Sequence, residues 1–336
     1  MSNRYSRQEL FSPIGKGGQQ KIKNSHVFIL GCGALGTACA ESLTRAGVGK
    51  ITLVDRDYVE LSNLQRQHLF AEQDVIDELP KVVAAKNRLE QINHEVEIQT
   101  SIMDATTEDL SSLLEGVDVA IDATDNFDVR LMMNDLFHQM NIPWIYGSCV
   151  SSSGMSFTII PGESPCLHCI LEGVPMSLAT CDSVGIISPA VQMVVAHQVT
   201  EALKILVGDQ EALRTRLVTF DLWQNRYHQI KMDQAKKEHC QTCGKYPSYG
   251  YLTYGKQTKT EVLCGRDTVQ IRPRQAYPLT DLAKRFHQLG EVKSNSFLLS
   301  LRYEKYRLVF FKDGRTLIHG TESIEEAKKI YYQLVG

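Results

Sequence analysis

The amino-acid sequence predicts an α/β fold: a Rossmann-like, doubly wound and mostly parallel sheet with added antiparallel strands, followed by a small C-terminal α+β domain. Over the first half of the chain, short apolar runs alternate with segments of helical spacing, which is typical of parallel strands joined by helices. The first run, residues 26–30, ends in the glycine-rich turn GCGALG, and a helix follows. The chain has 336 residues. One hydrophobic core usually serves roughly 250–300 residues, so we expect a second domain.

The other elements of the main domain show the same alternation of short apolar runs and segments of helical spacing. Strands are expected over residues 50–55, 96–101, 117–123 and 144–147, with helices over 81–92 and 129–140 between them. Two later strands, 154–161 and 217–222, flank a long apolar helix over 189–207. The alternation predicts helices on both faces of the sheet.

The apolar periodicity lapses around residues 245–259, which predicts one domain over 1–250 and another over 255–336. In the second domain we expect strands near 261–271 and 297–303, a hairpin turn at Asp313-Gly314, and helices over 281–289 and 323–334. Residues 255–336 contain 15 basic and 9 acidic residues, a charge of +6, whereas the rest of the chain carries −9. A basic domain suits an acidic partner.

The composition excludes several classes of protein. Hydrophobic residues at 43% and charged residues at 22% are typical of a globular chain. A membrane span needs ~20 uninterrupted apolar residues, which we do not find, and a net charge of −3 does not suit a protein that neutralises nucleic-acid phosphates. We expect a cytoplasmic protein with no membrane or nucleic-acid partner. Without a secretion signal, the nine cysteines indicate metal ligands or a reactive thiol.

The glycine turn predicts a nucleotide site. Gly31, Gly33 and Gly36 have GxGxxG spacing between a strand and a helix, so backbone N–H groups and the helix N-terminus face a phosphate. Asp55 closes the next strand, where a carboxylate can accept ribose hydroxyls. These features alone favour a dinucleotide-dependent oxidoreductase.

The polar residues downstream favour a triphosphate instead. Charge on a leaving pyrophosphate must be met by fixed cations, for which a hydride-transfer site has little need. Asp125, after an apolar strand, lies where a carboxylate can hold Mg²⁺. No GxxxxGK[ST] motif occurs, so the chain is not a P-loop NTPase. The residues in question are the cations Arg66 and Lys81 and the amides Asn63 and Gln67, with the carboxylate Asp57 among them.

Several of these motifs, in this order, resemble the ThiF/MoeB/HesA family, bacterial relatives of the ubiquitin-activating enzymes. The resemblance covers about residues 1–245 and rests on Arg4-Tyr5-Ser6-Arg7-Gln8, GCGALG, SNLQRQ, Lys81 and Thr124-Asp125-Asn126. It implies ATP-dependent adenylation of the C-terminal glycine of a ubiquitin-like sulfur-carrier protein. By motif, the resemblance implies that Asp55 binds ribose, that Asn63, Arg66 and Lys81 bind the phosphates, and that Asp125 binds Mg²⁺.

The family also implies partners. Arg7 would reach the triphosphate of the other subunit in a homodimer, and the carrier would end in Gly-Gly. We expect a ThiS-type carrier of thiamine thiazole synthesis, with the small subunit of molybdopterin synthase (MoeB-type) as the alternative; a sulfur donor protein is a further possible partner. A dinucleotide-dependent oxidoreductase and a non-catalytic scaffold stay open as other classes.

The cysteines divide into two kinds. Cys166-x-x-Cys169 and Cys240-x-x-Cys243 have the spacing of zinc ligand pairs, and they would have to meet through the fold. Relatives in the family carry a structural zinc on two such pairs, with His168 a bystander. Cys181 lies in a stretch of small residues and matches a loop cysteine that, in this family, links covalently to the activated carrier or takes part in sulfur transfer; an unreactive thiol is the alternative.

Overall fold

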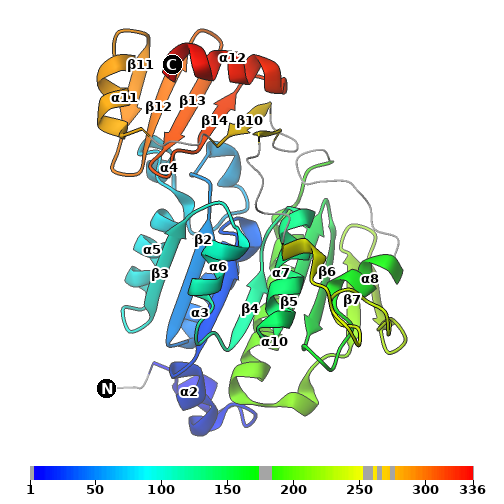
Figure 1. Cartoon of the computed structure of the whole chain (residues 1–336). Coiled ribbons are helices and arrows are strands. Elements are labelled where there is room, and N and C mark those ends of the chain that lie inside the picture. Colours follow the sequence, from blue (N-terminus) through cyan, green and yellow to red (C-terminus); the bar gives the residue numbers. More distant parts are fainter. Residues whose placement is uncertain (1–3, 174–183, 253–259, 263–266, 273–276, 336) are drawn as a thin grey trace. The chain divides into compact units, whose positions relative to one another are not determined.

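The structure is a computed structural model that describes residues 4–173, 184–252, 260–262, 267–272 and 277–335 (Figure 1). Contacts divide the chain into two compact units, of which the first extends to Gly255 and the second covers Lys256–Gly336. Each unit has a sheet of its own, with its own hydrophobic core.

The first unit is built on an eight-stranded sheet in the order β3-β2-β1-β4-β5-β6-β7-β8. Pairing is parallel from β3 to β5 and antiparallel from β5 to β8, which confirms the predicted mostly parallel sheet with added antiparallel strands. The strands are β1 (His26–Leu30), β2 (Lys50–Asp55), β3 (Glu97–Ile102), β4 (Val119–Asp122), β5 (Trp144–Val150), β6 (Ser153–Ile159), β7 (Arg216–Asp221) and β8 (Arg226–Lys231).

Helices cover both faces of this sheet (Figure 1). One core lies under α2 (Gly15–Lys23), α3 (Ala34–Ala46), α5 (Lys81–Ile92) and α10 (Ser188–Val207). The other lies under α6 (Thr107–Leu113), α7 (Phe127–Gln139) and α8 (Leu167–Gly173). The short elements are α1 (Ser6–Glu9), η1 (Leu61–Asn63), α4 (Glu72–Ile76) and η2 (Gln210–Ala212).

Helix α10 is the one described helix that is long and apolar enough to cross a membrane by length and composition. Half of its apolar window is buried inside the protein, and it packs on β5, β6 and α3. Gln198 on α10 is fully buried, and its Nε2 donates to the carbonyls of Asp122 (2.7 Å) and Ile145 (3.2 Å). A Cβ on Gly147 of β5 would lie 2.3 Å from the same Nε2, so this contact requires glycine. We therefore interpret α10 as a core helix.

The second unit is a six-stranded sheet in the order β11-β12-β13-β14-β10-β9. All of its pairings are antiparallel, and helices α11 and α12 pack on it, as expected of an α+β domain. The predicted Asp313-Gly314 turn joins β13 to β14, with Gly314 at φ +89°. Its elements are β9 (Thr260–Val262), β10 (Thr268–Ile271), α11 (Leu279–Phe286), β11 (Glu291–Ser294), β12 (Leu298–Tyr303), β13 (Tyr306–Phe311), β14 (Thr316–His319) and α12 (Ile324–Val335).

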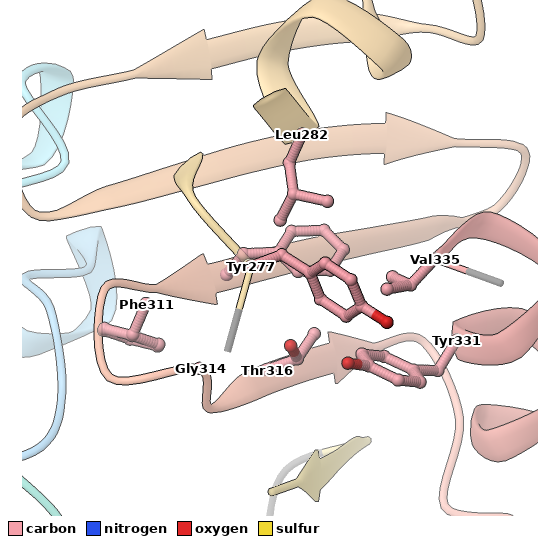
Figure 2. Close-up of a pocket in the computed structure, with 8 residues that line it drawn as sticks. Tyr277, Leu282, Phe311, Gly314, Thr316, Tyr331 and Val335 are labelled. Carbon is pink, nitrogen blue, oxygen red and sulfur yellow. The ribbon is translucent and has the colours of Figure 1, made fainter. Parts of the chain in front are cut away.

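A small pocket of about 210 Å³ lies in the second unit (Figure 2). Four of its eight lining residues are aromatic, and the buried hydroxyl of Thr316 has no hydrogen-bond partner among the described residues. Much of this volume is open to solvent, so the enclosed space accommodates little more than a water molecule.

Sequence-based prediction missed α2, α6, α8 and β8 of the first unit, together with the short elements α1, η1, α4 and η2. Strand β8 is exposed along its whole length, so it lacks the apolar run by which strands were identified. In the second unit, the single strand expected near 261–271 is two strands, β9 and β10, paired antiparallel, and β11 is additional. Strand β11 is mostly exposed and, like β8, lacks an apolar run.

Candidate active site and metal centre

The predicted nucleotide residues lie around the carboxyl ends of β1, β2 and β4. Gly31 follows β1 with φ +96°, and a Cβ there would lie 2.4 Å from the carbonyl oxygen of Ala123, just after β4. A Cβ on Gly36 would lie 1.9 Å from the carbonyl oxygen of Gly31. Both contacts are possible only for glycine. They let helix α3 start close against the turn, and Gly33 is its N-cap.

Asp55 holds the glycine turn in place from the end of β2. Its two carboxylate oxygens accept hydrogen bonds from the backbone N–H of Cys32 (2.6 Å) and of Asp57 (2.7 Å). Burial raises the pKa of Asp55, and the charge of Lys81 opposes that shift. The structure therefore brings Asp55, Asp57 and the glycine turn together.

Lys81 is a buried cation at the same edge of the sheet. It opens helix α5, its side chain is 5% exposed, and its Nζ lies 3.1 Å from Oδ2 of Asp57. Its backbone N–H donates to the Asp57 carbonyl at 2.9 Å. Burying an ammonium is costly unless it is paired, and Asp57 supplies a partner for this one.

The SNLQRQ segment lies on η1 and the residues after it. Asn63 is buried, and its Oδ1 accepts the N–H of Glu60 at 3.1 Å. Gln67 is also buried, and its Nε2 lies 3.9 Å from where a Cβ on Gly33 would be. Its Oε1 has no hydrogen-bond partner among the described residues. An amide facing the glycine turn with an unused oxygen is suited to a ligand that supplies a donor.

The remaining predicted residues are less fixed. Arg66 is half-buried and donates from Nη1 to the Ser62 carbonyl (2.9 Å). Asp125 is exposed and directly precedes Asn126, the N-cap of α7. Arg7 is exposed on the four-residue helix α1, and no hydrogen bond or ion pair between described residues joins it to the glycine turn. Cys181 lies outside the described residues.

Sequence reasoning missed two charged pairs beside this site. Arg56 and Asp104 approach to 3.0 Å at the ends of β2 and β3. Arg130 and Asp122 approach to 2.9 Å in full burial at the end of β4. The second pair had a sequence signal that we did not use: a strand-ending aspartate followed, eight residues on, by an arginine in the next helix.

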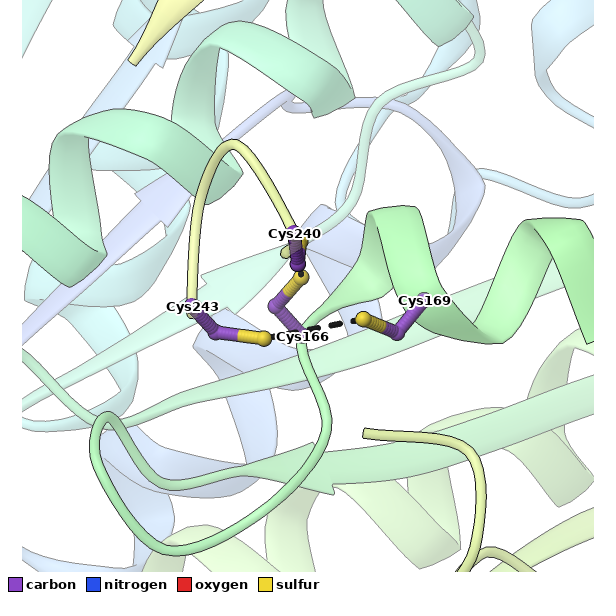
Figure 3. A group of neighbouring side chains, drawn as sticks. All are labelled: Cys166, Cys169, Cys240 and Cys243. Carbon is purple, nitrogen blue, oxygen red and sulfur yellow. Dashed lines mark hydrogen bonds between the residues drawn. The ribbon is translucent and has the colours of Figure 1, made fainter. Parts of the chain in front are cut away.

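The four predicted zinc ligands form one cluster (Figure 3). Their sulfur atoms all lie within 4.8 Å of one another, with Cys166 Sγ 3.5 Å from Cys240 Sγ and Cys169 Sγ 3.6 Å from Cys243 Sγ. Four thiolates at ~2.3 Å from a tetrahedral ion have sulfur–sulfur distances of roughly 3.8 Å, so this donor set fits Zn²⁺. Hydrogen bonds from the neighbouring thiols lower the pKa of Cys243 to about 4.

Helix α7 holds both cysteine segments. Asn134 Oδ1 accepts the N–H of Leu167, next to Cys166 (2.9 Å). Asp135 accepts the hydroxyl of Thr242, inside the second pair (2.5 Å), and the N–H of Tyr251 (2.9 Å). His168 Nδ1 lies 3.8 Å from Cys240 Sγ, beside the cluster.

Comparison with known proteins gives a family match and several relatives. The model of the ThiF family matches residues 5–242. A Bacillus subtilis (strain 168) protein named sulfur carrier protein ThiS adenylyltransferase is 48% identical over all of both chains. The Escherichia coli (strain K12) protein of the same name is 35% identical over 72% of this chain and 94% of its own length. An Anopheles gambiae protein named adenylyltransferase and sulfurtransferase MOCS3 is 35% identical over 78% of this chain and 58% of its own.

Solved structures show the same fold. The crystal structure of E. coli MccB with ATP superposes with a TM-score of 0.62 at 24% identity, covering 73% of this chain and 74% of that one. At this identity the likeness shows the fold alone, and it confirms the predicted Rossmann-like α/β architecture.

Proposed function

The chain belongs to the ThiF family, and on this premise we propose that it adenylates the C-terminal glycine carboxylate of a ThiS-type sulfur-carrier protein, releasing pyrophosphate. The observation that carries the proposal is the buried Lys81 beside the glycine turn, in a chain aligned over its whole length with a ThiS adenylyltransferase. Membership of this family of adenylyltransferases decides against an oxidoreductase or a scaffold.

The site suits attack on the α-phosphorus of ATP. A carboxylate is ionised at pH 7, so it attacks without a general base, and catalysis reduces to positioning and charge stabilisation. The turn Gly31–Gly36 and the start of α3 would receive the phosphates, and Asp55 the ribose. Lys81, Asn63 and Arg66 would meet the charge of the leaving pyrophosphate, and Arg7 of a partner copy would add to it in a homodimer.

Two metals complete the proposal. The exposed carboxylate of Asp125, next to the turn, is a hard oxygen ligand of the kind that Mg²⁺ takes in company with substrate phosphates. Bound there, Mg²⁺ would neutralise charge on the departing oxygens. The four cysteines would hold a structural Zn²⁺, since all four positions of a tetrahedral ion would be filled by protein.

Cys181 is proposed as the thiol that links covalently to the activated carrier, forming a thioester and releasing AMP, or that takes part in sulfur transfer to the carrier. A sulfur donor protein is then a second partner. We expect both partners, and the enzyme itself, in the cytoplasm.

We also propose that residues 1–250 and 255–336 are separate domains. The E. coli relative supports this division, because its 242 aligned residues make up 94% of its length. The second domain, with its charge of +6, is proposed to attract an acidic carrier or sulfur donor, in which case carrier affinity falls steeply with salt.

The alternative is the same reaction on the small subunit of molybdopterin synthase. The mosquito relative named adenylyltransferase and sulfurtransferase supports it at 35% identity, against 48% for the B. subtilis protein. ATP–pyrophosphate exchange with each carrier in turn separates the two. We expect exchange with the ThiS-type carrier; exchange with the molybdopterin carrier alone would favour the alternative, and none with either would refute both.

A further inference from the structure

The end of strand β4 contains a buried ion pair, formed by Asp122 and Arg130. Asp122, the last residue of β4, is fully buried, and the side chain of Arg130 on α7 is 5% exposed. Such pairs add little stability of their own, because desolvating two charges offsets their attraction. A buried pair of this kind is best explained by the geometry that it fixes.

Three hydrogen bonds of the pair go to Thr124, in the segment between β4 and α7. Asp122 Oδ2 accepts from Arg130 Nε (2.9 Å), and Oδ1 accepts both the N–H and the hydroxyl of Thr124 (2.9 Å each). Arg130 Nη2 donates to the Thr124 carbonyl at 2.5 Å and to the Gly147 carbonyl on β5 at 3.1 Å. Both polar groups of the Thr124 backbone are thus bound by the pair.

The neighbouring residues are fixed as well. The Ala123 N–H donates to the Leu30 carbonyl on β1 (2.9 Å), and Asn126 caps α7 by accepting from Asp128 and Val129. Asp125 lies between these anchored residues, with its side chain exposed. Ala123 also packs against Gly31 and Gly36, so the same segment forms one wall of the phosphate turn.

The two charges of the pair offset part of each other's desolvation. Burial raises the pKa of Asp122, and the Arg130 guanidinium opposes that rise. Burial alone would lower the pKa of Arg130, but the nearby carboxylates, Asp122 first among them, raise it overall. The rings of Phe127 and Tyr146 lie 5.4 Å and 5.3 Å from the guanidinium and exclude water from it.

We propose that Arg130 is a positioning residue of the adenylation reaction: through Asp122, Thr124 and Gly147 it fixes residues 123–126, so that Asp125 meets Mg²⁺ at the phosphate turn. The inference rests on the proposed function and on Asp125 as the magnesium ligand. A lysine at 130 would keep the charge but has one donor group in place of a planar fork, so it cannot hold Asp122, Thr124 and Gly147 together.

The test measures metal binding directly. Mn²⁺ replaces Mg²⁺, and its binding to the full-length protein with a non-hydrolysable ATP analogue is titrated by electron paramagnetic resonance. Arg130→Lys is expected to weaken Mn²⁺ binding about tenfold, while metal-free binding of the analogue in EDTA changes less than twofold. In pyrophosphate exchange, the Mg²⁺ concentration for half-maximal rate rises to a similar extent, and saturating Mg²⁺ restores most of the rate.

Arg214→Lys is the matched control. Arg214 is also a largely buried arginine, bonded to His197 on α10 (3.0 Å) and to Ser156 on β6 (2.9 Å), but it contacts no residue of the segment 123–126. It is expected to lower thermal stability to a similar degree without moving Mn²⁺ affinity. Asp122→Asn, which keeps size and loses the charge, is a second variant in case Arg130→Lys does not fold.

The outcomes separate the two proposals. Unchanged Mn²⁺ affinity in Arg130→Lys and Asp122→Asn overturns the positioning role, even if exchange is active in the unmodified protein. Weaker Mn²⁺ binding in these variants supports it, even if no carrier supports exchange and the carrier assignment therefore fails. Absence of nucleotide-dependent Mn²⁺ binding in the unmodified protein overturns both.

Discussion

The nucleotide site and the cysteine cluster are both held by helix α7, yet they are built in opposite ways. The cluster collects four identical side chains from two short motifs and encloses them. The nucleotide site collects different residues from β1, β2, β4, η1 and α5, and it leaves an amide oxygen of Gln67 unused and a carboxylate of Asp125 exposed. The difference teaches that the cluster supplies a full set of four ligands from protein alone, whereas the proposed nucleotide site has polar groups left over for a ligand.

This comparison predicts the largest effect for the removal of one cluster ligand. Cys240→Ser should remove Zn²⁺ and lower the free energy of unfolding by about 4 kcal/mol or more, because metal-binding energy at such a site is folding energy. Urea unfolding together with zinc analysis measures it. Cys149→Ser, a cysteine outside the cluster, is the control and should keep its zinc. Unmodified protein purified without zinc, and as stable as with it, would contradict the assignment.

The next effect concerns activity and should leave the fold intact. Lys81→Met keeps the aliphatic stem and removes the charge, and it should slow carrier-dependent pyrophosphate exchange about 100- to 1,000-fold, as loss of a preorganised charge-stabilising group does. Lys86→Met, on the exposed side of the same helix, should leave the rate within twofold. Equal rates for the two variants would show that the buried lysine has no part in the reaction.

A smaller effect should appear where α7 supports the cluster. Asp135→Asn weakens the hydrogen bonds to Thr242 and Tyr251, and we expect a loss of about 1–3 kcal/mol in unfolding free energy together with faster zinc release to a chelator. Release can be followed with a colorimetric zinc dye. Asp128→Asn, exposed in the first turn of α7, should match the unmodified protein. A normal zinc-release rate in Asp135→Asn would show that these hydrogen bonds from α7 do not support the cluster.

The smallest effect is an acid sensitivity in the nucleotide half. Burial lowers the pKa of His26 on β1, with Lys50 adding to the shift, and the ring accepts or donates to Thr52 at 2.8 Å. A histidine with a lowered pKa binds protons more readily when unfolded, so stability is lost as the pH falls through about 6.5. The unfolding midpoint of His26→Gln should fall less between pH 7.5 and 5.5 than that of the unmodified protein. An equal fall of the unfolding midpoint in both proteins would show that other titrating groups cause the acid sensitivity.

The sequence predicted most of what depends on local pattern. The strands over 50–55 and 217–222 and the helix over 81–92 lie where their apolar spacing placed them, because each buries a face of its own. The GCGALG, SNLQRQ and Thr124-Asp125-Asn126 motifs located the glycine turn and the polar residues around it. Strand β8 and the pair Asp122–Arg130 were not predicted, for two different reasons. One lacks an apolar signal, and the other depends on a contact between a strand end and a helix that only the fold brings together.

Gly147 lies between the two helical layers of the first unit. On one face of the sheet its missing side chain makes room for the Gln198 amide, and its carbonyl on β5 receives the Arg130 guanidinium. Since even a methyl group at 147 would overlap the Gln198 amide, related chains should accept a larger residue at this position only together with a shorter one at 198. The two positions should therefore vary as a pair during divergence, and a chain in which only one of them has changed should show a displaced α10.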